Sequence, residues 1–222
     1  MRNKRLIIIS IVLNSILLIF ELLSVSEVFL RYLPDAEPFP WYYTITYYTN
    51  ISNIILLLGT VCSLILDIKD IAGIGGYKSS LVKWCGVITT QVTFVTVWLL
   101  ILVSGEIQYG IDLTGSMWLF MHTICPILGL ITFILFDFRN KVYVKDVFIP
   151  VLVTIIYTLA ILVLSLFGER IPYASNLEGY FQITWYFILL CGFIEAIVTT
   201  GLGFLIGYIK NLFIMKKNIF HE

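Results

Sequence analysis

Six long apolar stretches decide what this chain can fold into. The hydrocarbon layer of a bilayer is about 30 Å thick, and about 20 helical residues are needed to cross it. Each stretch has roughly that length and is bounded by charged residues, proline or glycine. The stretches cover residues 6–30, 44–66, 82–104, 117–137, 147–167 and 181–209. The sequence therefore predicts an all-α integral membrane bundle of six transmembrane helices, with residues 1–222 forming a single domain.

The overall composition agrees with a membrane bundle. Hydrophobic residues make up 59% of the chain and charged residues 13%, which leaves too little polar surface for a soluble domain. The formal net charge is zero, so no overall field attracts nucleic acid. The four cysteines lie inside apolar stretches without CxxC or Cys/His spacing, which argues against a disulfide framework and a zinc site. We expect no metal, no cofactor and no nucleic-acid partner.

The lysines and arginines predict which way the helices cross. In membrane proteins the cytoplasmic loops carry an excess of basic residues. If the N-terminus is cytoplasmic, only Arg31 and Arg170 of the 14 basic residues fall in outer loops. The other 12 fall in cytoplasmic segments: Arg2, Lys4, Arg5, Lys69, Lys78, Lys83, Arg139, Lys141, Lys145, Lys210, Lys216 and Lys217. This pattern predicts a multi-pass protein of the cell membrane with both termini cytoplasmic, and that requires an even number of spans.

Polar residues inside the predicted spans are costly to insert, and they therefore indicate a site. His122 is the most unusual of them, because the only other histidine of the chain is His221. At 1.5 Å per residue, Thr49 and His122 both lie about 8 Å below the outer surface. By the same rise, Glu21 lies about 22 Å from the inner surface. A threonine, a histidine and a carboxylate in one layer are groups that nucleophilic catalysis uses.

Other polar residues extend this layer along helix faces. Thr49, Ser52 and Asn53 share one face of the second predicted span, and Gln91 and Trp98 are a heptad apart in the third. Polar faces in lipid turn to the bundle interior, so we expect a cavity between the first four spans, open toward the outer leaflet. Structural roles are the alternative: threonine bonding its own i−4 carbonyl, or asparagine, serine and histidine bonding neighbouring helices. A stripe of small residues in the sixth span predicts close helix packing: Gly192, Ala196, Thr199, Gly203 and Gly207.

Four segments, in order along most of the chain, resemble one known family. "YYTNISNIILL" (47–57) resembles the opening of the second span in the androgen-induced gene product family, and "FMHTICP" (120–126) resembles its Met-His-Thr…Pro element. "WCGVITTQVTFVTVWLLI" is similar to the third span of that family, and "GERIPYASNLEGY" to the loop before the last. The last segment has Ile-Pro-Tyr where the family usually has aromatic-Tyr-Pro. The match is best with the bacterial six-span branch.

The resemblance implies a threonine hydrolase of fatty acid esters of hydroxy fatty acids. The nucleophile of the family falls on Thr49 and its partner on His122, the pair that lies at equal depth. We expect Thr49 to attack the acyl carbonyl of a membrane lipid or fatty-acyl ester that enters from the outer leaflet, with His122 accepting the proton. The supporting or substrate-binding residues are Asn50 and Asn53 as oxyanion donors, Glu21 to orient the histidine, and Ser52, Gln91 and Trp98.

Two other functions remain open. A small-solute or proton-coupled transporter would use Glu21, Glu195, Gln91 and His122 as its path. Such a path needs polar groups through the whole thickness of the membrane, whereas the sequence places most of them in the outer half. The third possibility is a lipid-binding membrane protein without catalytic activity. The oligomeric state is not indicated by the sequence.

Overall fold

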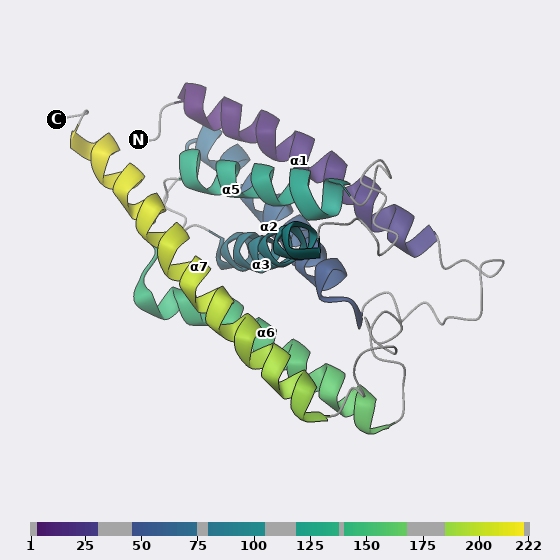
Figure 1. The fold of residues 1–222 in the computed structure, drawn as a ribbon. Helices are drawn as coiled ribbons and strands as arrows, with labels where there is room; N and C mark the ends of the chain where they lie inside the picture. The colour runs from purple at the N-terminus through teal and green to yellow at the C-terminus, as the bar shows by residue number, and fades with distance from the viewer. Residues whose placement is uncertain are drawn as a thin grey trace.

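The computed structural model describes residues 4–30, 46–74, 80–104, 119–137, 140–167 and 185–219. Every regular element in these ranges is a helix, and the chain order is shown by colour in Figure 1. The elements are α1 (Lys4–Leu30), α2 (Tyr48–Ile71), α3 (Leu81–Ser104), η2 (Phe120–Ile124), α5 (Cys125–Leu135), α6 (Val144–Leu166) and α7 (Trp185–Ile219). η2 is one π-helical turn that continues directly into α5.

Five of the described helices, α1, α2, α3, α6 and α7, are long and apolar enough to cross a membrane. η2 and α5 together form a shorter apolar helix, Phe120–Leu135. The all-helical prediction is thus confirmed for the described residues, and the apolar helices indicate a multi-pass membrane protein. The count of six spans stays a prediction, because the fourth predicted span begins at residue 117, outside the described residues.

The predicted bounds agree with the helices to within a few residues, except at the end of the chain. α7 continues past the predicted end at residue 209 to Ile219. No glycine or proline follows Gly207 in this segment, and lysine, leucine and methionine all favour a helix. Helix α7 therefore extends beyond the end of the apolar stretch, and its end could not be predicted from apolar length alone.

Helix α3 lies at the centre of the bundle. Figure 1 shows α1, α2 and α5 grouped beside it, with α6 and α7 packed side by side across the other flank. α3 contacts α2, α5, α6 and α7, and every residue from Lys83 to Thr93 is buried. Side chains on all faces of this half of α3 therefore meet protein, so any polar group there must find its partner within the bundle.

Two glycines bring α2 and α3 into backbone contact. A Cβ atom at Gly59 would overlap the backbone of Lys83, and one at Gly86 would overlap the backbone of Leu56. Small residues allow this close approach of membrane helices. The contact places the beginning of α3 against the middle of α2, well before the end of α2 at Ile71. Lys83 thereby enters the bundle.

The predicted packing of the small-residue stripe on α7 is confirmed for two of its glycines. A Cβ atom at Gly192 would overlap the side chain of Thr158, and one at Gly203 would lie 2.8 Å from a methyl group of Val147. Both partners belong to α6, which α7 follows closely in Figure 1. Glycine thus allows α6 and α7 to pack closely.

Candidate functional site

The start of α2 is anchored by α6. The Tyr48 hydroxyl and Thr154 Oγ1 are 2.9 Å apart, and the Tyr157 hydroxyl donates to the carbonyl oxygen of Thr46 at 2.9 Å. The rings of Tyr48 and Tyr157 meet edge to face, with centroids 5.0 Å apart. These contacts fix the first turn of α2, in which Thr49 is the second residue.

The hydroxyl of Thr49 differs from most threonine hydroxyls in this bundle. Threonines deeper in the helices donate to a carbonyl oxygen three or four residues earlier, as Thr60 does to Leu56 at 2.8 Å. The same bond is made by Thr89, Thr90, Thr93, Thr132, Thr154, Thr158, Thr199 and Thr200. Thr49 is 92% buried, with 8% of its surface exposed, yet its hydroxyl has no hydrogen bond among the described residues. At the second position of a helix no preceding helical turn offers a carbonyl, so this hydroxyl stays available.

A π-helical turn carries His122. The N–H of Cys125 donates to the carbonyl oxygen of Phe120, five residues earlier, in place of the usual four. Pro126 explains this turn, because its ring would collide with the carbonyl four residues earlier, at His122, in a regular helix. The wider turn relieves that collision and sets the direction in which the histidine points. His122 itself is half-buried.

Pro126 also leaves a carbonyl without its helical partner, and α2 supplies one. In the π-helical pattern each N–H donates to the carbonyl five residues earlier, so the next bond would run from residue 126 to Met121 O. Residue 126 is a proline and has no N–H to donate. Asn53 Nδ2 donates to Met121 O at 3.4 Å and to Thr49 O at 2.8 Å. The fully buried amide of Asn53 therefore joins the turn that contains Thr49 to the turn that contains His122.

Helices α1 and α3 hold the same π-helical turn from other sides. Trp98 Nε1 donates to Thr123 Oγ1 at 3.2 Å, and Gln91 Nε2 donates to Pro126 O at 2.8 Å. The rings of Phe20 and Phe120 lie 4.9 Å apart. Helices α1, α2 and α3 thus position the segment that carries His122. We call this arrangement, Thr49, Asn53, Gln91, Trp98 and residues 120–126, the histidine site.

The histidine site brings together most of the residues predicted from the sequence. Ser52 belongs to it through its hydroxyl, which donates to Thr49 O at 2.8 Å, and Asn50 lies half-buried in the same turn. The interhelical role considered for asparagine is confirmed for Asn53. Gln91, one of the residues named for a transport path, donates its side-chain amide to Pro126 O.

Asn53 is a poor candidate for the predicted role of oxyanion donor. A side-chain amide has two N–H donors, and both oxygens that its nitrogen contacts are backbone carbonyls, Thr49 O and Met121 O. Donation to a substrate would break one of these bonds. The sequence could not reveal this, because the carbonyl of Met121 loses its partner only through the π-helical turn.

Glu21 lies in a second polar group, which we call the lysine chain: Asp67, Ser10, Asn14, Lys83, Thr60 and Glu21. Ser10 Oγ donates to Asp67 Oδ2 at 2.6 Å, and Asn14 Nδ2 donates to Ser10 Oγ at 3.2 Å. Lys83 Nζ donates to Asn14 Oδ1 at 3.2 Å and to Thr60 Oγ1 at 2.8 Å. Thr60 Oγ1 lies 3.4 Å from Glu21 Oε1.

All six residues of the lysine chain are buried, with at most 2% of the surface of each exposed. Glu21 is hydrogen-bonded to Thr60 of α2 and interacts electrostatically with Lys83 of α3 and with Cys125 of α5. Its predicted role in orienting His122 stays a prediction. The expectation that polar groups gather in the outer half of the bundle is wrong. Ser10, Asn14 and Asp67 lie toward the other end, because α1 and α2 run antiparallel.

Lys83 and Lys210 were expected in cytoplasmic segments, yet both are completely or almost completely buried. Lys210 Nζ lies 3.9 Å from Asp137 Oδ2 and 3.5 Å from the centre of the Phe133 ring. The sequence did contain a signal for a buried lysine. Asn14 and Glu21 are seven residues apart in an otherwise apolar span and therefore lie on one helix face. A carboxylate buried in such a place needs a cation nearby, which predicts a buried lysine or arginine.

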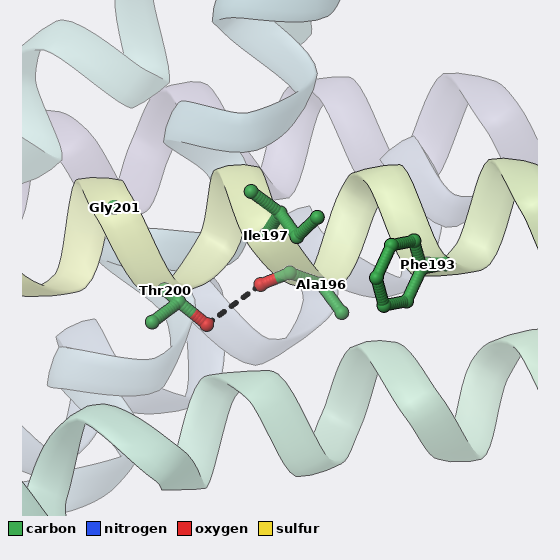
Figure 2. A pocket seen from close by; sticks show the side chains of 5 residues that line it. All are labelled: Phe193, Ala196, Ile197, Thr200 and Gly201. Carbon is green, nitrogen blue, oxygen red and sulfur yellow. Dashed lines mark hydrogen bonds between the residues drawn. The ribbon is translucent and has the colours of Figure 1, made fainter.

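A hollow of about 480 Å³ lies elsewhere, on α7. Its lining, drawn in Figure 2, comes entirely from α7: Phe193, Ala196, Ile197, Thr200 and Gly201. The Thr200 hydroxyl points to the carbonyl of Ala196 within the same helix and donates to it at 2.7 Å. None of these residues belongs to the histidine site or to the lysine chain. The predicted cavity between the first four spans stays a prediction.

Comparisons of this chain with protein-family models, with curated proteins and with solved structures found no match. The resemblance to the androgen-induced gene product family therefore stays a prediction that depends on the segments quoted above.

Proposed function

We propose that this protein is a lipid-ester hydrolase that works inside the membrane, with Thr49 as nucleophile and His122 as general base. The observation that carries the proposal is the Thr49 hydroxyl, which has no hydrogen bond within the described ranges. It lies one helical turn from Asn53, which is bonded to the histidine-bearing turn. A nucleophilic hydroxyl must be free of other acceptors if a base is to take its proton. The resemblance selects the same two residues.

In the proposed reaction, the Thr49 oxygen attacks the acyl carbonyl of a fatty-acyl ester while its proton passes to the imidazole of His122. The tetrahedral intermediate collapses as the histidine returns that proton to the departing alkoxide, which leaves as an alcohol. Water then attacks the acyl-threonine while His122 accepts one of its protons. The second tetrahedral intermediate collapses as His122 returns that proton to Thr49 Oγ1, and the fatty acid is released. The reaction uses no cofactor.

The oxyanion would be stabilised at the beginning of α2. The first backbone N–H groups of a helix lack helical partners, and the helix dipole places partial positive charge there. The N–H groups of Asn50 and Ile51 both donate to Tyr47 O, which leaves the N–H groups of Tyr48 and Thr49 as the candidate oxyanion donors. This assignment replaces Asn53, whose amide is engaged with two backbone carbonyls.

The orientation of the protein forms part of the proposal. The basic residues favour six spans with both termini cytoplasmic, in the cell membrane. The beginning of α2 then belongs to the outer leaflet, and the substrate, a membrane lipid or fatty-acyl ester, enters the histidine site sideways from that leaflet.

Purified protein in lipid nanodiscs, given a long-chain fluorogenic ester, would test the reaction. Thr49→Ala, His122→Ala and the double variant should show similarly low turnover, because loss of either member already prevents the shared proton transfer. Thr49→Ser should retain part of the activity, since it keeps a hydroxyl. The matched control is Thr132→Ala, which removes a buried threonine whose hydroxyl bonds only its own helix.

Additive losses in the double variant, or full activity of Thr49→Ala, would contradict the proposed pair. If Thr132→Ala loses as much activity as Thr49→Ala, the loss reflects folding and the proposal fails. Labelling of the wild type, but not of Thr49→Ala, by an acyl-directed hydrolase probe would detect the acyl-threonine directly.

A second candidate function, proton-coupled transport, is favoured by one specific observation. The lysine chain carries buried charged and polar groups to the end of the bundle opposite Thr49, as a transport path requires.

A further inference from the structure

Glu21 ends the lysine chain with one oxygen that has no partner. Oε1 lies 3.4 Å from Thr60 Oγ1, whereas Oε2 has no hydrogen bond among the described residues. The residue is fully buried, with none of its surface exposed. A carboxylate in such a place is costly unless it is paired or protonated. This oxygen is therefore a place where a proton can reside.

Thr60 is the only hydrogen-bonded link recorded between Glu21 and Lys83 in the described part of the chain. Its hydroxyl accepts from Lys83 Nζ at 2.8 Å and donates to Leu56 O at 2.8 Å. A turn of this hydroxyl about its C–O bond aims its proton at Glu21 Oε1 instead. Amine, hydroxyl and carboxyl thus form a series through which one proton can shift.

Buried polar side chains continue beyond both ends of this series. Asn14, Ser10 and Asp67 follow from Lys83 toward one end of the bundle, each linked to the next by a hydrogen bond. On the other side of Glu21, α1 continues its buried face with Ser24, three residues along and fully buried. Ionisable side chains inside membrane proteins serve as proton relays, and the ionisable members here are Asp67, Lys83 and Glu21.

We propose that this protein moves protons through the interior formed by α1, α2 and α3, with Lys83, Thr60 and Glu21 as the proton-exchange unit. The proposal goes beyond ester hydrolysis and does not rest on it, since the unit lies apart from Thr49. The ligand is the proton itself.

The central step conserves charge. An N–H bond of the Lys83 ammonium breaks as its proton binds Thr60 Oγ1, while the original proton of that hydroxyl moves to Glu21 Oε1. The charged pair becomes a neutral amine and a neutral carboxyl, and no net charge is created inside the membrane. A water molecule that enters from the Ser24 side accepts the proton that Glu21 releases, and hydronium on the Asp67 side supplies another to Lys83, which restores the charged pair. The Asn14 amide holds Lys83 in place but does not relay the proton, because its nitrogen can only donate.

Ionisable groups face this unit from each neighbouring element. Asp67 of α2 and Asp137, just after α5, act electrostatically on Lys83, and the Cys125 thiol of α5 lies close enough to interact with Glu21. η2, the turn that carries His122, packs against α1 through Phe120.

Proton uptake by proteoliposomes would test the proposal. Vesicles with internal potassium and a trapped pH dye receive valinomycin, so that the potential drives protons inward. The wild type should acidify the interior faster than protein-free vesicles. Thr60→Val should be slower by about tenfold or more, because it removes the bridging hydroxyl at nearly constant shape. Glu21→Gln should be slowed likewise.

Thr89→Val is the matched control, because it removes a fully buried threonine of α3 whose hydroxyl bonds only its own helix. It should retain the wild-type rate, and monodisperse elution establishes that each variant is folded. Glu21→Gln carries the test if Thr60→Val aggregates. The proposal is overturned if the wild type is no faster than empty vesicles, if the Thr60 and Glu21 variants keep its rate, or if Thr89→Val falls with them.

Discussion

At the scale of single residues, the most important feature is a backbone carbonyl that lacks a hydrogen-bond donor within its own helix. Pro126 has no N–H to offer Met121 O, and the amide of Asn53 donates to that oxygen from another helix. A buried amide that serves two backbone carbonyls is costly to remove. Asn53 therefore acts as a positioning residue, because it joins α2 to the histidine-bearing turn.

Replacement of Asn53 by leucine should destabilise the bundle and weaken ester hydrolysis. The change keeps the branched shape and the number of heavy atoms but leaves Met121 O buried without a donor, which costs about 1–3 kcal/mol. We expect a melting temperature several degrees lower, measured by thermal unfolding in detergent. Thr200→Val is the control, because its hydroxyl donates to a carbonyl within its own helix. Equal melting temperatures for the two variants would rule out the positioning role of Asn53.

At the scale of helices, backbone contact between α2 and α3 decides where charged residues lie. The glycines at positions 59 and 86 let the two helices touch, and this contact places Lys83 beside Thr60. A bulkier residue at either position would move α3 outward. The lysine chain therefore depends on the close packing of α2 against α3 as much as on its own side chains.

Gly59→Ala and Gly201→Ala should have opposite effects on stability. The new methyl group at position 59 would meet the backbone of Lys83, which cannot rotate away, and such overpacking costs about 1–3 kcal/mol. At position 201 nothing lies within 4 Å of the added atom, so alanine should stabilise the helix by about 0.5–1 kcal/mol. Thermal unfolding of both variants measures the difference. A Gly59→Ala protein as stable as the wild type would mean that α2 and α3 are not in backbone contact.

At the scale of the whole molecule, apolar side chains cover the outside and charged groups lie inside, which is the reverse of a soluble protein. Large apolar side chains cover the outside of the helices, including Ile8, Leu22, Leu58, Leu152, Ile156, Leu190 and Phe193. The interior instead holds the charged groups of Glu21, Lys83 and Lys210. Hydrocarbon solvates the first set without cost, whereas the second set needs protein partners.

The direction of insertion can be tested with single cysteines in a background whose four native cysteines are alanine. Ala72→Cys, in the exposed segment after α2, should react with an impermeant maleimide only from the cytoplasmic side. Gly110→Cys, in a predicted outer loop, should react only from outside. Labelling of both from the same side would contradict the single membrane crossing that is predicted between them, residues 82–104.

Apolar length by itself determined that this chain forms long membrane helices, because about 20 apolar residues are needed to cross a bilayer. Unusual polar residues within those stretches also identified Asn53, Gln91 and Trp98 as neighbours of the His122 segment, since costly groups turn inward. Helix faces can be derived from a period of 3.6 residues. For these residues the local pattern and the packed structure agree.

Only the tertiary structure decided which polar groups meet. Glu21 was expected beside His122 from its depth alone, whereas its recorded partner is Thr60, linked in turn to Lys83. Depth along a helix follows from counting residues, but contact depends on which helices touch and at what height. Backbone contact at Gly59 and the π-helical turn before Pro126 set those heights and directions. The first arises from close packing between segments that are distant in the sequence, and the second from a proline within the helix. A helical period of 3.6 residues encodes neither.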